Sequence, residues 1–145
     1  MKKILLVIAV LFCGIALYAK PPAGWTDDYE AALKTARKEK KHVYVLFTGS
    51  DWCHWCIELR KDVLTKSEFK RFANKNLVLV YCDFPRKNSP SAEQMAKQQQ
   101  WAQQLGAGRG VPSAVIVDSD GKVAGKISGY APLKSYMKKL ESIVK

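Results

Sequence analysis

Two cysteines three residues apart give the sequence its clearest chemical signal. Cys53 and Cys56 enclose His54 and Trp55 in the stretch GSDWCHWCIELR, which covers residues 49–60. A cysteine thiolate can ligate a metal, attack a disulfide or pair with a second thiol. Four kinds of site therefore have to be compared: a metal clip, a haem attachment point, a structural disulfide and a redox centre.

The residues around the two cysteines disfavour metal and haem sites. Haem attachment needs a histidine directly after the second cysteine, and this chain has Ile57 there. A structural zinc ion would find two or three ligands in Cys53, His54 and Cys56, but no second ligand pair follows at a suitable spacing. A copper-handling dithiol stays open as an alternative, and we assign no resident metal ligand and no cofactor.

A redox centre fits the spacing best. A cysteine at the start of a helix meets unpaired backbone N–H groups and the positive end of the helix dipole, and both favour the thiolate. Cys53 precedes the predicted helix and is expected to be the exposed nucleophile. Cys56, one turn in, is expected to be shielded and to resolve a mixed disulfide. An inert structural bridge is the weaker alternative, because so short a loop constrains the unfolded chain little.

Hydrophobic periodicity predicts alternating helices and strands around these cysteines. Continuous apolar runs, typical of strands covered on both faces, occupy residues 42–48 and 77–84. Shorter strand patterns at residues 113–118 and 122–128 flank a turn and predict a hairpin. Helical patterns cover residues 26–40, the stretch from the cysteines to about 76 with a break near Thr65, the stretch from Ser91 to Gly106, and about 132–144.

Capping residues predict where the helices begin. Thr26 is expected to cap the first helix, ahead of acidic residues that suit the positive end of the helix. Thr65 with Glu68, and Ser91 with Gln94, have the spacing of capping boxes. Each of the later two helices is therefore expected to start with a side-chain cap.

The order of these elements predicts an α/β fold. Helical crossovers between buried strands imply parallel pairing, and the hairpin adds antiparallel strands at the edge. We expect a central mixed sheet flanked by helices, with the cysteines at the carboxyl end of a strand. Open α/β sheets favour that end for binding and reaction sites.

The N-terminal residues have the pattern of an export signal. Two lysines, an apolar run and a small residue at Ala19 predict a signal peptide over residues 1–19 and a single domain over residues 20–145. An uncleaved membrane anchor is the alternative, although the apolar run is short for a full span. Cys13 follows the bulky Phe12, which disfavours a lipid-modified cysteine. The predicted location is the periplasm or the extracellular space, where disulfides are permitted.

The chain is strongly basic, with a formal net charge of +11. The excess is spread over predicted helix faces and is not gathered with the base-reading or stacking residues of a nucleic-acid binder. We therefore expect no nucleic-acid partner. Solvated helix faces explain most of the charge, and a preference for acidic protein partners or an anionic membrane surface is the alternative.

The sequence resembles the thioredoxin superfamily. Trp52, Cys53 and Cys56 form a WCxxC motif after a buried strand, and Gly110-Val111-Pro112 precedes a strand, a hairpin and a final helix. This element order covers nearly all of residues 26–144, with only the family's first strand unclear. The resemblance implies a thioredoxin-like fold with a cis bond before Pro112, beside Cys53. It also implies that Val111 and Pro112 contact substrate.

Two departures from cytosolic thioredoxin stand out. His54 and Trp55 replace the Gly-Pro between the cysteines, and Phe47 replaces a buried aspartate that assists proton transfer. The resolving step must then rely on another base, such as Asp51, Glu58 or water, or be slower. Trp52 and Trp55 are expected to line the surface around the reactive sulfur.

Two further residues near the motif have alternative readings. His54 is either a thiolate stabiliser or a solvated side chain. Cys82 lies in a predicted central strand and is expected to be an inert buried thiol.

The sequence therefore predicts an exported thiol–disulfide oxidoreductase that cycles Cys53 and Cys56 between dithiol and disulfide. Trp52, His54, Trp55 and Pro112 are its expected supporting residues. Its expected partners are proteins with thiols or disulfides and an unidentified redox donor or acceptor, and a monomer is favoured. Reduction, oxidation and isomerisation all stay open. The alternative is a non-catalytic binding module on the same fold or a copper-handling dithiol protein.

Overall fold

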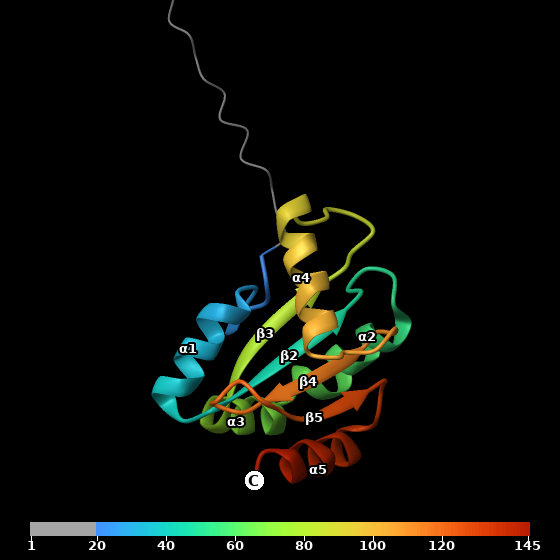
Figure 1. The fold of residues 1–145 in the computed structure, drawn as a ribbon. Coiled ribbons are helices and arrows are strands. Elements are labelled where there is room, and N and C mark those ends of the chain that lie inside the picture. The colour runs from blue at the N-terminus through green and yellow to red at the C-terminus, as the bar shows by residue number, and fades with distance from the viewer. Residues whose placement is uncertain (1–19) are drawn as a thin grey trace, which may run out of the picture.

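A five-stranded mixed sheet forms the centre of the computed structural model, which describes residues 20–145 (Figure 1). The predicted signal peptide and Cys13 lie outside the described residues. The strand order is β1-β3-β2-β4-β5; β1 and β2 pair with β3 in parallel, whereas the β2–β4 and β4–β5 pairs are antiparallel. The strands are β1 (Trp25–Thr26), β2 (His42–Thr48), β3 (Leu77–Asp83), β4 (Ser113–Val117) and β5 (Val123–Ser128).

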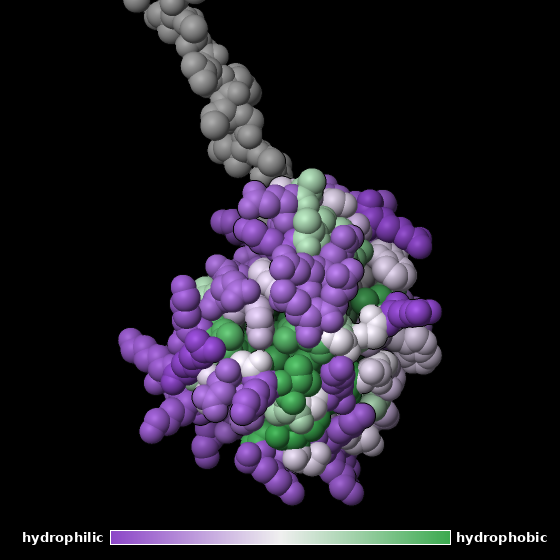
Figure 2. All heavy atoms as spheres, in the orientation of Figure 1, coloured by the Kyte–Doolittle hydropathy of each residue, from purple (hydrophilic) through white to green (hydrophobic). Residues whose placement is uncertain are grey.

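Helices cover both faces of this sheet. Side chains of α1 and α4 share one buried cluster with the sheet, and those of α2, η1, α3 and α5 share the other. Figure 2 shows hydrophilic residues on the outward sides of α1 and α4, with apolar residues gathered between these helices over the sheet. The helices are α1 (Tyr29–Glu39), α2 (His54–Leu59), the π-helix η1 (Arg60–Leu64), α3 (Ser67–Asn76), α4 (Ala92–Gln104) and α5 (Leu133–Ile143). The predicted α/β fold is confirmed.

Burial on both faces explains why β2 is a continuous apolar run. Tyr44 and Leu46 enter the cluster under α3 and α5, whereas Val43, Val45 and Phe47 enter the cluster under α1 and α4. Alternate side chains of a strand point to opposite faces, so a strand at the middle of a covered sheet needs apolar residues at every position.

The first helix begins later than the sequence predicts. Asp28 is its N-cap, and the Asp28 carboxylate accepts a hydrogen bond from the Ala31 N–H at 3.0 Å. Thr26 is instead part of β1, because Trp25 and Thr26 pair with β3. The prediction of a Thr26 cap is therefore wrong, and the strand that the sequence left unclear is this two-residue β1.

The capping boxes have mixed outcomes. The chain breaks near Thr65 as predicted, but the Thr65 hydroxyl donates back to the Lys61 carbonyl at 3.0 Å, and α3 starts after Lys66 without a side-chain cap. The Thr65 box is therefore wrong. The Ser91 cap is confirmed, because its hydroxyl accepts the Gln94 N–H at 3.1 Å. The Gln94 side chain, however, donates to the Asp27 carbonyl.

Among residues 20–145, no helix has both the length and the apolar character needed to cross a bilayer. Two buried features test this fold: a pair of tyrosines in the core and the free thiol of Cys82.

The hydroxyls of Tyr44 and Tyr136 hydrogen-bond to each other in the core, and burial raises the pKa of both phenols. We predict that Tyr136→Phe lowers the free energy of unfolding by about 1–3 kcal/mol, because it leaves the Tyr44 hydroxyl buried without its partner. The double change to phenylalanine should cost less than the sum of the two single changes. Urea unfolding of the three variants measures this, and additive losses would contradict the prediction.

Cys82 is fully buried among the side chains under α1 and α4, as expected, and burial raises the pKa of its thiol well above its usual range. Because the thiolate is the reactive form, we predict that iodoacetamide at pH 8 does not label Cys82 in the native protein. The same treatment in urea should label it fully. Peptide mass spectrometry at Cys82 reads out both reactions, and rapid native labelling would show that this core opens.

Candidate active site

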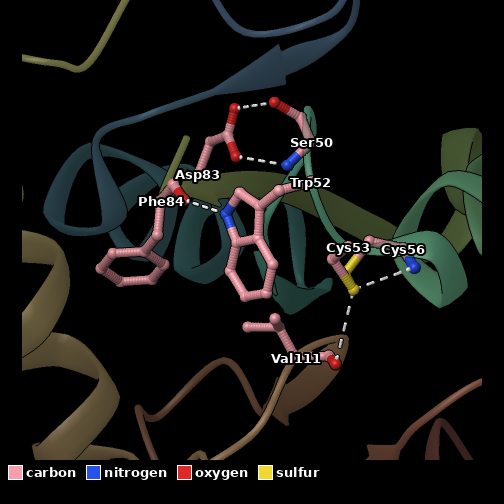
Figure 3. Close-up of a disulfide and its surroundings, with 7 residues drawn as sticks. All are labelled: Ser50, Trp52, Cys53, Cys56, Asp83, Phe84 and Val111. Atoms are coloured by element: carbon pink, nitrogen blue, oxygen red, sulfur yellow. Dashed lines mark hydrogen bonds between the residues drawn. A yellow bond between two sulfur atoms is a disulfide. The ribbon is translucent and has the colours of Figure 1, made fainter. Parts of the chain in front are cut away.

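The two cysteines lie just after the carboxyl end of β2, the middle strand of the sheet. Residues 49–53 connect β2 to α2, and Cys53 is the N-cap of that helix. Cys53 and Cys56 form a disulfide, and their Cα atoms are 5.2 Å apart. Figure 3 shows the bridge at the start of the helix, facing Val111. The predicted position at the carboxyl end of a strand is confirmed.

The helix start supplies a hydrogen-bond donor to the first sulfur. The backbone N–H of Cys56 donates to Sγ of Cys53 at 3.2 Å. In the reduced protein, the same N–H is placed to stabilise negative charge on Cys53, as a thiolate needs. The start of the helix therefore offers this backbone donor to Cys53.

Both cysteines are nonetheless buried. Cys53 is 7% exposed and Cys56 is 4% exposed, so the expectation of an exposed Cys53 is wrong for this disulfide form. The loop before β4 covers the bridge, since Sγ of Cys53 lies 3.6 Å from the carbonyl oxygen of Val111. The two cysteines are almost equally buried, and they differ in position, because Cys53 is the N-cap of α2 and Cys56 lies within the helix.

The loop before Cys53 is held by the end of the neighbouring strand β3. The carboxylate of Asp83 accepts both the backbone N–H and the hydroxyl of Ser50, and the indole N–H of Trp52 donates to the Phe84 carbonyl at 2.8 Å (Figure 3). Asp83 is not among the site residues that the sequence predicts. The signal that could have identified Asp83 is an acidic residue at the end of a buried strand. That strand pairs with β2, which leads to the cysteines.

Asp51, considered above as a base, is a second anchor of this loop. Its two carboxylate oxygens accept the backbone N–H groups of Arg86 and Lys87 at 2.9 and 2.8 Å. These bonds lower the pKa of Asp51 below its usual value. Glu58, the other carboxylate considered, lies 3.7 Å from the Lys61 ammonium.

The loop that faces the disulfide contains the predicted proline. The Val111–Pro112 bond is cis, as expected, and Val111 contacts Cys53. Two side chains fix the chain before it: the Ser113 hydroxyl donates to the Ala107 carbonyl, and the Lys126 ammonium donates to the Gly106 carbonyl, each at 2.6 Å.

Aromatic side chains surround the disulfide at the surface. Trp52 is 41% exposed and Trp55 is 55% exposed, in agreement with the surface position expected for them. The Trp55 ring stacks on Tyr130 at a centroid distance of 5.2 Å, and the exposed His54 meets the edge of the same indole. Tyr130, which the sequence did not reveal, donates its hydroxyl to Asp62 at 3.1 Å.

Two hollows meet at Val111. The larger, of about 520 Å³, is lined by Trp52, Phe84 and Val111 among others, and the smaller, of about 300 Å³, by Trp55, Pro112 and Tyr130 together with Val111. Val111 lines both hollows and also contacts Cys53, so a polypeptide lying along Val111 has a hollow on either side of it. Within residues 20–145, no three His, Cys, Asp or Glu side chains are arranged to hold a metal ion.

Comparison with known proteins agrees with this geometry. The family described as "Thioredoxin-like domain" matches residues 29–143. The "Disulfide bond reductase DsbH" of Chlamydia pneumoniae is 37% identical over 121 residues, which cover 82% of this chain and 72% of that protein.

Solved structures give the same result. The structure titled "DsbH Oxidoreductase" has a TM-score of 0.74 and 33% identity, covering 88% of this chain and 92% of the other. The reduced C-terminal domain of DsbD from Neisseria meningitidis has a TM-score of 0.61 and 25% identity, covering 78% and 91%. The chain therefore belongs to the thioredoxin-like family, and with its Cys53–Cys56 pair it is a thiol–disulfide oxidoreductase.

Proposed function

We propose that this protein is an exported disulfide reductase in which Cys53 attacks the substrate and Cys56 resolves the mixed disulfide. The observation that supports this assignment of roles is the Cys56 N–H bonded to Sγ of Cys53, because such a donor suits a thiolate at Cys53. The direction of reaction is supported by a relative, the disulfide bond reductase of Chlamydia pneumoniae.

The reaction uses the two thiols in turn. The Cys53 thiolate attacks one sulfur of a substrate disulfide, forms a mixed disulfide and expels the other substrate sulfur as a thiolate. That thiolate takes the proton of Cys56. The Cys56 thiolate then attacks Sγ of Cys53, which closes the internal disulfide and releases the second substrate thiolate, protonated by water. Two electrons pass to the substrate, and an external dithiol donor must later restore the enzyme.

The loop containing Val111 is proposed to position the substrate. The Val111 carbonyl lies 3.6 Å from Sγ of Cys53, so a substrate strand paired with Val111 would bring its own disulfide to the attacking sulfur. Pro112 and Trp55 line the hollow on one side of this loop, and Trp52 lines the hollow on the other side. We assign to His54 a supporting role only, through its contact with Trp55.

Export rests on the sequence. The basic start and apolar run of residues 1–19 support a cleaved signal peptide, and residues 20–145 are then the mature domain. We propose a periplasmic or extracellular monomer that acts on disulfide-containing proteins. Outside the cytosol, disulfides persist as substrates for such an enzyme.

Single cysteine variants test the two roles. Cys56→Ser should still attack a substrate disulfide and should accumulate a mixed disulfide through Cys53, because no thiol is left to resolve it. Cys53→Ser should trap nothing and should lose insulin reduction. Non-reducing gels and intact-mass spectrometry detect the trapped species.

Cys82→Ala is the matched control for loss of a cysteine. We expect it to keep insulin reduction, since Cys82 is buried in the core and takes no part in the exchange. Equal loss in the Cys53 and Cys56 variants, with no trapped species in either, would refute the two-step reaction.

A further inference from the structure

We propose that Arg86 and Arg109 make this protein select substrate segments in which acidic residues flank an apolar side chain. The apolar side chain would enter the larger hollow beside Trp52, and the acidic residues would meet the two guanidinium groups. This inference rests on the proposed function, because it concerns the substrate of the same disulfide.

The hollow itself suits an apolar side chain. Phe47, Trp52, Phe84 and Val111 line it, and Val111 also contacts the reactive sulfur. A substrate side chain bound in the hollow would therefore belong to a residue within a few positions of the cysteine under attack. Phe47 gives the hollow an apolar wall at the position where cytosolic thioredoxin has a carboxylate.

Two arginines stand at this hollow. The Arg86 guanidinium lies over the Trp52 ring at 4.9 Å from its centroid, and Arg109 lines the hollow directly. Both arginines are exposed. In the part of the chain that the structure describes, the ion pairs are Lys41–Glu39, Lys61–Glu58 and Lys97–Glu93, so neither guanidinium is paired with a carboxylate. A guanidinium offers a planar set of donors that matches a carboxylate.

The main chain that carries the arginines is fixed in advance. Asp51 holds the backbone N–H groups of Arg86 and Lys87, so its carboxylate is engaged by the loop itself. The chain before Arg109 is held by Lys126 through the Gly106 carbonyl. A binding site whose backbone is already ordered loses less entropy when its ligand arrives.

The shape of the site favours an acidic polypeptide over an anionic membrane surface. Arg109 lines a concave apolar hollow, Arg86 lies against Trp52 in the wall of that hollow, and a flat bilayer surface cannot fill it. The other basic residues are spread over helices such as α1, where Lys34 and Lys38 are exposed. We therefore assign the selection of acidic substrates to Arg86 and Arg109, and not to the overall positive charge of the chain.

Two disulfide-containing peptides test this selectivity. They share a phenylalanine next to the reactive cysteine and differ only in two flanking residues, glutamate in one and glutamine in the other. We expect the reduced protein to react about fivefold faster with the acidic peptide at low salt, and the preference to shrink at high salt. Stopped-flow tryptophan fluorescence measures the rate constants.

Charge variants locate the preference. R86Q/R109Q should bring the ratio of the two rates to about one, and each single change should lower it in part. K34Q/K38Q is the matched control, because it removes two exposed lysine charges from α1 and should keep the ratio of the unchanged protein. An unchanged ratio in R86Q/R109Q would overturn the proposal.

A small neutral disulfide separates this inference from the proposed function. If the unchanged protein reduces neither hydroxyethyl disulfide nor either of the two peptides, the reductase function itself is refuted. Reduction of both peptides at equal rates would refute only the charge selectivity. Loss of binding to phosphatidylglycerol vesicles in R86Q/R109Q, with equal peptide rates throughout, would assign the arginines to a membrane surface and overturn the proposal.

Discussion

The abrupt turn from β2 into α2 is the constraint on which the site depends. Within residues 49–53 the chain leaves the buried sheet and places Cys53 at the helix start. Gly49 permits this turn, because a Cβ there would lie 2.5 Å from the Trp52 indole. Asp83 holds Ser50 from the neighbouring strand through its backbone N–H and its hydroxyl. The reactive sulfur is thus positioned by the ends of β2 and β3 through a short loop whose residues are held in place.

The two faces of the site come from parts of the chain that are far apart in sequence. The strand pair β2 and β3 positions the cysteines, and the antiparallel strand β4 positions the loop that ends in Val111 and Pro112. Because β4 pairs directly with β2, this loop and the start of α2 meet at one end of the sheet. The contact between Val111 and Cys53 follows from this pairing, and it covers Cys53, which the sequence predicted to be exposed.

Features with a local cause were predictable from the sequence. The apolar run of β2, the Ser91 cap and the position of Cys53 before a helix all follow from neighbouring residues. Thr26 failed as a cap because pairing with β3 overrode its local preference. Tyr130, Asp83 and Arg109 could not be identified in advance, because only the folded chain brings them beside Trp55, Ser50 and the hollow at Trp52.

Stabilisation of a Cys53 thiolate has two opposite effects: it activates the nucleophile, and it weakens the reducing power of the dithiol. A thiolate at Cys53 would be stabilised by the Cys56 N–H, and a stabilised thiolate makes a dithiol a weaker reductant. About 30 mV of potential corresponds to about 1.4 kcal/mol for this two-electron exchange, so modest electrostatic effects decide which disulfides can be reduced. The more the thiolate of such a dithiol is stabilised, the more its reducing power is limited to strained or exposed disulfides, whose potentials are high.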